Sequence, residues 1–246
     1  HGMPLPFAKT QLYHHSTNTP LIVSWPSVTK PGSINDFYMV SAVDLLPTFL
    51  RIAEIKDPEG TGNLGLRGIQ GRSFLPIIKG SLNPPVSSVI FKEYNENSGG
   101  IRNPMRGVQT PQYLYLFNPW SNGKRAMATA TNGTATWKRM LELASENETI
   151  RKRVDVMRYR TVEELYDINN DPDCLHNLAK SKEHQKTIKD LRQRLHDWMK
   201  TTNDHALTAF AERNDPEKME SYIKTVQTES DLRRKNKRKK RRNKKA

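Results

Sequence analysis

The chain has 246 residues, of which 35% are hydrophobic, and its formal net charge is +14. This length suits one large domain or two small ones, and no apolar run approaches the roughly 20 residues of a membrane span, which excludes an integral membrane protein. The single cysteine, Cys174, excludes a disulfide framework within the chain. No basic and then apolar leader opens the sequence, so we expect no export signal within it.

The first third of the chain predicts few regular elements. An apolar run at 21–25, bounded by two prolines, is typical of a buried strand. Apolar residues recur every three or four positions over 39–55 and predict a helix, within which Pro47 indicates either a break or a nearby start. Residues 56–72 are rich in glycine and charge and predict a loop, and 73–81 predicts a short helix.

The rest of the chain mixes both kinds of element. Alternating apolar residues predict a strand over 86–94 and two strands over 105–118, around a Thr-Pro-Gln turn. Residues 136–154 predict a helix and 164–173 a strand that runs into a turn. Residues 182–201 predict the clearest helix, with one apolar stripe opposite a charged face. Together these elements predict an α/β or α+β class.

Most of the positive charge lies at the C-terminal end. Residues 233–246 hold eleven of the 40 Lys and Arg residues, and the other 29 nearly balance 26 acidic residues. This tail has no apolar side chain except Ala246, so we expect it to be disordered. Three roles stay open for it: a solubilising extension, binding of polyanions, and nuclear localisation.

Short motifs follow one another over the first 80 residues in a fixed order. The opening ones are His1-Gly2, Lys9, Tyr13, Pro20-Leu21-Ile22-Val23 and Trp25-Pro26. The predicted helix then contains Asp44, Leu45, Pro47 and Thr48, and GIQGRSFLPIIKG follows at 68–80. This order resembles that of the sulfatase family.

The second half narrows the resemblance. NPMRGVQT (103–110), the helix with Trp137, YRTVEELYDINNDPDCLHNLA (159–179) and the last amphipathic helix resemble the heparan N-sulfatases, or N-sulfoglucosamine sulfohydrolases, and their bacterial relatives. The resemblance covers roughly residues 1–203. The segment beyond 204, with the basic tail, lies outside it.

The resemblance implies an alkaline-phosphatase-like α/β fold, of which this chain would hold the last part. Residues 1–82 would form the end of the large catalytic domain, and 83–203 a smaller C-terminal subdomain with an antiparallel sheet and a packed helix. Residues 204–232 would form a helical or irregular extension before the disordered basic tail at 233–246.

The same resemblance implies hydrolysis of sulfate esters or N-sulfate groups of glycosaminoglycan-like glycans, with Ca²⁺ as cofactor. The family nucleophile is a formylglycine made from a Cys-x-Pro-x-Arg motif, which is absent: Cys174 lies in Asp-Cys-Leu-His-Asn. We therefore expect a C-terminal fragment that is inactive alone. Relatives are usually exported or lysosomal, so we expect the intact enzyme to be secreted, periplasmic or lysosomal.

Carried over residue by residue, the resemblance assigns His1 to the metal site, although imidazole suits softer metals than calcium. It assigns Lys9 to the sulfate, where an ammonium stabilises negative charge both before and during reaction. His15 would contact sugar hydroxyls or a carboxylate. Arg102 and Arg106 would bind the anionic glycan, and salt bridges at the sheet edge are the alternative for both.

Two other functions stay open. The first is a catalytically dead sulfatase-like module that binds polyanions through the basic tail. The second is association with nucleic acid, which rests only on residues 233–246 and lacks any recognition motif, so we do not expect it.

Overall fold

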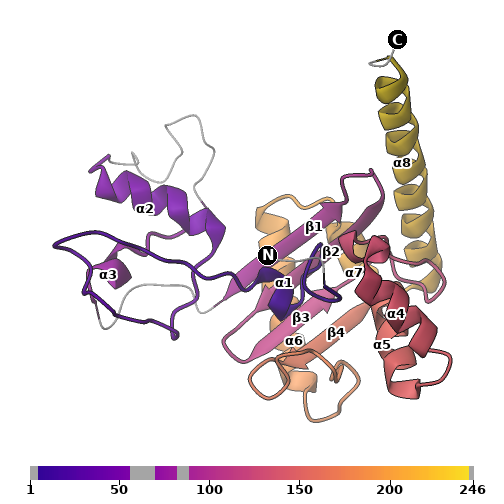
Figure 1. Cartoon of the computed structure of the whole chain (residues 1–246), viewed down its shortest axis with the longest axis horizontal. Helices are drawn as coiled ribbons and strands as arrows, with labels where there is room; N and C mark the ends of the chain where they lie inside the picture. The colour runs from indigo at the N-terminus through magenta and orange to yellow at the C-terminus, as the bar shows by residue number, and fades with distance from the viewer. Residues whose placement is uncertain (1–4, 56–69, 82–88, 244–246) are drawn as a thin grey trace. The chain divides into compact units, whose positions relative to one another are not determined.

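The structure is a computed structural model that describes residues 5–55, 70–81 and 89–243. The chain divides into two compact units: unit 1 comprises His1–Thr19 with Phe91–Ala246, and unit 2 comprises Pro20–Ile90 (Figure 1). Residues 5–19 therefore pack with the second half of the chain.

Unit 2 is organised by a helix and a short segment bound to it. The 3₁₀ turn η1 (Ala42–Asp44) leads into α2 (Leu45–Ile52), with Pro47 in its first turn, and α3 (Leu75–Ile78) follows. Asp44 accepts hydrogen bonds from the backbone N–H groups of Ser41 and Arg72, both at 2.8 Å. Thr48 accepts one from Phe74 N at 3.0 Å. The Asp-Leu-x-Pro-Thr motif thus fastens residues 72–74 to α2.

The strand predicted at 21–25 is absent, and this prediction was wrong for the structure. These residues have no regular secondary structure, and Leu21, Ile22 and Val23 are exposed. A strand needs neighbours that satisfy its backbone N–H and C=O groups. In the described part of unit 2 no strand lies beside this segment.

Unit 1 is built on a four-stranded antiparallel sheet, which confirms the expected small sheet. Its strands are β1 (Ile90–Glu96), β2 (Arg102–Gln109), β3 (Tyr113–Phe117) and β4 (Glu163–Asp167), in the order β1-β2-β3-β4. In β2 and β3, Arg106 pairs with Phe117, and in β3 and β4 Tyr115 pairs with Leu165. The predicted Thr-Pro-Gln turn joins β2 to β3.

Helices cover both faces of the sheet (Figure 1). One face carries the N-terminal segment with α1 (His14–Thr17), then η2 (Ala130–Gly133), α4 (Ala135–Leu143) and α5 (Glu148–Tyr159). The single helix expected over 136–154 is two helices, because Asn147 caps α5 by accepting a hydrogen bond from Ile150 N at 3.1 Å. The buried side chains shared by this layer and the sheet are Phe7, Leu12, Tyr13, Met105, Leu114, Leu116, Trp120, Trp137, Met157 and Tyr166.

The opposite face carries α6 (Gln185–Thr201) and α7 (Leu207–Ala211). The predicted apolar stripe of α6 is confirmed: Ile188, Leu191 and Leu195 are buried. Ring contacts bind both helices to the strands, since Phe91 of β1 stacks on Trp198 at 5.1 Å and Phe117 of β3 meets Phe210 edge-on at 4.9 Å.

Glu163 of β4 ties this second layer together. Its carboxylate accepts hydrogen bonds from Arg192 of α6 at 2.7 and 2.6 Å, from Arg213 at 3.2 Å and from the Tyr115 hydroxyl. Burial alone would raise its pKa, but the bonds from Arg192 and Tyr115 hold the pKa of Glu163 below its usual value. The carboxylate therefore stays charged at neutral pH.

The C-terminal end differs from the expected disordered tail. Helix α8 (Pro216–Asn243) includes residues 233–243, and residues 244–246 lie outside the described part. Lys and Arg have high helix propensity, and a helix that is already formed extends at little cost. The absence of apolar side chains was therefore an insufficient sign of disorder.

No helix among the described residues is both long enough and apolar enough to cross a membrane.

The packing of α6 can be tested by replacing one buried and one exposed helical leucine with alanine and comparing the losses of stability. Leu195 is fully buried, whereas Leu141 of α4 is 41% exposed. We expect Leu195→Ala to lower the free energy of unfolding by about 2–5 kcal/mol, because it removes buried methyl groups and leaves a cavity. Leu141→Ala removes the same atoms and should cost less than about 1 kcal/mol. Denaturant unfolding measures both, and equal losses would contradict the described packing.

Candidate functional site

The N-terminal segment of residues 5–17 is held on the sheet by one long-range hydrogen bond network. The Tyr13 hydroxyl donates to Glu164 Oε2 of β4 at 2.7 Å, across 151 positions of sequence. The same buried carboxylate accepts from the Tyr166 hydroxyl at 2.8 Å and from Asn118 Nδ2 at 2.9 Å. Burial raises the pKa of Tyr13 well above its usual value, so the hydroxyl keeps its proton and remains a donor.

Aromatic and cationic side chains reinforce this attachment. The Arg153 guanidinium lies 3.6 Å from the centroid of the Phe7 ring, and that of Arg160 lies 4.3 Å from the Tyr13 ring. Arg153 also donates to the carbonyl oxygens of Asp173 and Cys174, at 2.6 and 2.7 Å. Cation–π contacts of this kind are strengthened by burial. The turn at 173–174 is therefore fixed beside the segment.

Lys9 lies within a short stretch of unusual backbone. Phe7 and Thr10 have φ angles of 64° and 57°, in the left-handed region that non-glycine residues rarely adopt. The conformation of Phe7 is stabilised by burial of its side chain. That of Thr10 is stabilised by its hydroxyl, which accepts a hydrogen bond from Ala130 N at 3.1 Å. Among the described residues no hydrogen bond or ion pair engages the Lys9 ammonium. The backbone of Lys9 is thus fixed while its charge stays available.

Two histidines follow in α1. His15 Nε2 lies 2.8 Å from Asp173 Oδ1, and both side chains are at least half exposed. His14 is partly buried, and burial together with the nearby Lys92 charge lowers its pKa. At neutral pH His14 is therefore an uncharged imidazole. Asp173 orients the ring of His15, which lies in the same N-terminal layer as Lys9.

Lys92 of β1 is a buried cation beneath α1. Its Nζ donates to Gln109 Oε1 at 2.5 Å, to Thr17 Oγ1 at 2.6 Å and to Leu12 O at 3.5 Å. All three acceptors are neutral, and burial lowers the pKa of Lys92 to about 7. The side chain joins β1 and β2 to both ends of the Leu12–Thr17 stretch.

Cys174 is buried in its turn and is not equipped as a nucleophile. Burial raises the pKa of the thiol to about 11, so the thiolate is scarce at neutral pH.

Arg102 and Arg106 lie away from the N-terminal segment. Met105 of β2 packs in one core with Phe7 and Tyr13. Residues 102 and 106 of the same strand lie on the other face of the sheet. Arg106 is buried and binds Asp204 with two hydrogen bonds, at 2.5 and 3.1 Å. Arg102 forms an ion pair with Glu229 of α8. The structure thus brings Lys9 and His15 into one layer, and it binds Arg102 and Arg106 to C-terminal carboxylates.

The metal assignment lies outside the structure, because His1 is not among the described residues. Within residues 5–55, 70–81 and 89–243, no group of three or more His, Cys, Asp or Glu side chains gathers in a way that could hold an ion.

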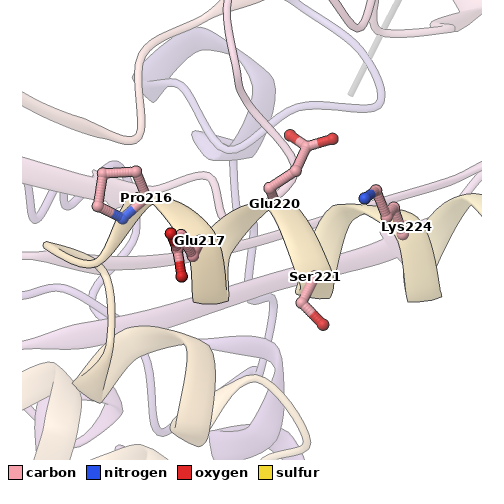
Figure 2. A pocket seen from close by; sticks show the side chains of 5 residues that line it. All are labelled: Pro216, Glu217, Glu220, Ser221 and Lys224. Carbon is pink, nitrogen blue, oxygen red and sulfur yellow. The ribbon is translucent and has the colours of Figure 1, made fainter.

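A surface hollow of about 370 Å³ lies along the first turns of α8. Figure 2 shows its lining side chains, Pro216, Glu217, Glu220, Ser221 and Lys224, all of which project from that one helix. A binding pocket normally gathers polar groups from several elements, which this hollow does not do. We therefore place the candidate site at the N-terminal segment.

The sequence reading missed two functional supports, Lys92 and Glu164. The signal for Glu164 was present: two consecutive acidic residues inside the strand pattern EELYD must point to opposite faces of a sheet, so each needs a partner. For Lys92, a charged residue in the apolar context VIFKEY was the only hint.

The attachment of the N-terminal segment can be tested by removing one hydroxyl. We expect Tyr13→Phe to lower the free energy of unfolding by about 1–2 kcal/mol, because it leaves a buried carboxylate with one donor fewer. Hydrogen exchange of the backbone amides of residues 5–17 should become faster. Tyr113→Phe loses only an exposed hydrogen bond with Gln112 and serves as control. Unchanged exchange in Tyr13→Phe would contradict the role of Glu164.

The burial of Lys92 predicts a pH dependence of stability. Its pKa is about 7 when folded and near 10.5 when unfolded, so between these values the unfolded chain binds more protons and stability rises with pH. Relative to Lys92→Met, the wild type should gain up to about 1.4 kcal/mol per pH unit from pH 7 to 9. Denaturant unfolding at several pH values measures this gain. The exposed Lys138→Met should follow the wild type, and a parallel Lys92→Met curve would refute the prediction.

The part of the chain that contains Lys9 and His15 is similar to known proteins. Residues 2–122 match the family model described as N-sulphoglucosamine sulphohydrolase, C-terminal. N-sulphoglucosamine sulphohydrolase of Homo sapiens is 28% identical over 210 residues, which are 82% of this chain and 40% of that protein. An ulvan-active sulfatase of Formosa agariphila is 29% identical over 188 residues, 75% of this chain and 33% of that protein.

Two further similarities were found. N-acetylglucosamine-6-sulfatase of Capra hircus is 30% identical over 178 residues, 72% of this chain and 28% of that protein. The solved structure of a 2-O GAG sulfatase overlaps with 65% of this chain and 25% of its own, with a TM-score of 0.41 and 22% identity. The chain thus spans well under half the length of these relatives, and the assignment rests on the sequence matches. The chain carries the C-terminal region of a sulfatase.

Proposed function

We propose that this chain forms the C-terminal part of an enzyme that hydrolyses sulfate esters or N-sulfate groups of glycosaminoglycan-like glycans. The observation that carries the proposal is the fixed N-terminal segment, which presents Lys9 while Tyr13 and Glu164 hold it on the sheet. The relatives support the substrate class, because their names describe activity on ulvan, N-sulphoglucosamine and N-acetylglucosamine 6-sulfate.

In this proposal Lys9 is the catalytic and sulfate-binding cation. Its ammonium would contact the non-bridging sulfate oxygens, whose charge changes as the bond to the leaving group breaks. The strained backbone at Phe7 and Thr10 supports this role, since such strain is concentrated at functional sites. His15, oriented by Asp173, would donate to a sugar hydroxyl or carboxylate.

The ion pairs of Arg102 and Arg106 favour the alternative that the sequence left open. A glycan anion would have to displace Asp204 to reach the buried Arg106, and removing one partner from a buried ion pair is costly. We therefore propose that Arg106 contributes by holding β2 against the segment that follows α6, and that Arg102 does the same for α8.

Calcium belongs to the proposal only for a longer protein. Sulfatases generally use a metal, and His1 would be one ligand, with the others supplied from outside the described residues. We assign no step of the reaction to the metal.

The nucleophile, like calcium, belongs to the proposal only for a longer protein. Cys174 is the only cysteine of this chain, and its thiol is buried in a turn. Three exposed apolar side chains of unit 2 support a covering partner in the longer protein: Ile22, Ile34 and Phe37 are 89%, 91% and 78% exposed.

The second candidate is an inactive module that binds polyanions. The basic end of α8 is the observation that favours it. Release of inorganic sulfate separates the two functions, because only the enzyme produces it.

The test measures sulfate release from N-sulfated and 6-O-sulfated glucosamine with added calcium. We expect none from the 246-residue chain, and turnover by the protein translated from the full reading frame that contains it. In that protein Lys9→Gln should lower kcat/KM by about 100- to 1000-fold, the usual loss when one group that stabilises the transition state is removed. The exposed Lys138→Gln should leave kcat/KM unchanged.

Three outcomes would contradict the proposal. Turnover by the 246-residue chain would show that its nucleophile had been missed. No turnover by the longer protein would favour the binding module. Full activity of Lys9→Gln would remove Lys9 from the site.

A further inference from the structure

Charge is divided unevenly along α8. Its first part, residues 216–232, contains two lysines and four acidic residues. Its last part, residues 233–243, contains nine Lys or Arg residues and no acidic residue. The two parts of one continuous helix therefore have opposite net charge.

The first part is fixed to the body of unit 1. Met219, Ile223 and Val226 are buried, and they recur at the three- and four-residue spacing of one helix face. The same face ends at Ser230, whose hydroxyl accepts a hydrogen bond from Arg102 N of β2 at 2.8 Å. The orientation of the basic part is thus set by apolar packing that precedes it.

One face of the basic part contacts the turn between β1 and β2. Arg233 Nη1 lies 2.7 Å from Glu96 Oε2, and Lys237 Nζ donates to Ser98 O at 2.9 Å. Gly100, with φ of 86°, lets the turn approach closely, because a Cβ there would lie 3.3 Å from that of Arg233. Arg233 and Lys237 are one helical turn apart, so this face is used inside unit 1.

Two rows of cations face away from that contact. Arg234 and Arg238 form one row and Lys235 and Lys239 the next, each pair one helical turn apart, and all four side chains are exposed. Figure 1 shows this part of α8 continuing past the strands of the sheet. Nine charges in eleven residues give about one per 1.8 Å of helix, close to the charge density of a nucleic acid duplex.

Such a row of like charges is unfavourable on its own. Like charges at this spacing destabilise a helix by a few tenths of a kcal/mol per pair. A linear polyanion lying along the rows would neutralise them and release its own counterions. Residues 233–246 contain no aromatic side chain on which a nucleobase could stack, so the surface reads charge alone.

We propose that the outward rows of α8, Arg234 with Arg238 and Lys235 with Lys239, bind a sulfated glycan chain outside the reaction site. The inference rests on the proposed function for its choice of polyanion, since a sulfatase that acts on glycans meets sulfated chains as substrates. Arginine forks match sulfate oxygens with two parallel hydrogen bonds, as they match phosphate. The helix would hold a long substrate near the enzyme between cleavage events.

The experiment uses the 246-residue chain and heparin as the sulfated probe. The test variant combines Arg234→Gln, Lys235→Gln, Arg238→Gln and Lys239→Gln. The matched control combines Lys138→Gln, Lys186→Gln, Lys189→Gln and Lys200→Gln, which are exposed helical residues and remove the same charge. Glutamine has a helix propensity close to that of Lys and Arg, so circular dichroism should show equal helix content.

We expect the test variant to bind heparin at least about tenfold more weakly than the wild type, with the slope of log K against log salt reduced by about three to four. The control variant should stay within about threefold of the wild type. Fully desulfated heparin should bind the wild type much more weakly than heparin does.

Several results would overturn the inference. Equal losses in both variants would assign binding to net charge, and equal binding of desulfated heparin would remove the role of sulfate. A DNA duplex of matched charge that binds as tightly as heparin would make α8 a nucleic-acid surface. The binding assays need no turnover, so they test the inference separately from the proposed function. Loss of selective heparin binding with sulfate release intact would refute the inference alone. Selective heparin binding without sulfate release by the longer protein would refute the proposed function alone.

Discussion

Two adjacent carboxylates on β4 hold the three layers of unit 1 together. Because neighbouring residues of a strand point to opposite faces, Glu164 binds Tyr13 of the N-terminal layer, and Glu163 binds Arg192 of the helical layer behind the sheet. Neither layer is attached through apolar packing alone. A shift of the strand by one residue would exchange the two carboxylates and leave both without their donors, so the pair also fixes the register of β4.

The candidate site depends on this arrangement rather than on its own contacts. Lys9 makes no described contact through its ammonium, and its position follows from Phe7, Tyr13 and the Thr10 hydroxyl. Lys92 adds a second attachment from below, through Thr17 and Leu12. A charge held by its backbone and left open at its tip suits a group that must meet an anionic ligand without moving far.

The sequence predicted the secondary structure that local patterns determine, but it did not predict the contacts between residues that are far apart in the chain. The apolar stripe of α6 and the Thr-Pro-Gln turn were sufficient to predict a helix and a hairpin. The run at 21–25 carries a strand pattern, but a strand forms only beside another one. For Arg106 the sequence left a glycan contact and a salt bridge open, because its partner Asp204 is 98 positions away and no spacing rule indicates such a pair. The contacts of Lys92 are hidden in the same way.

The bond between Tyr13 and Glu164 also constrains the order of events during synthesis. Tyr13 is synthesised well before its acceptor, which follows 151 residues later. At about 5–20 residues per second, the ribosome needs roughly 8–30 s to supply it. During that interval Phe7 and Tyr13 lack the part of their core that β4 supplies. Residues 5–17 can therefore form this bond only after β4 has been made, so the segment docks late in the folding of unit 1.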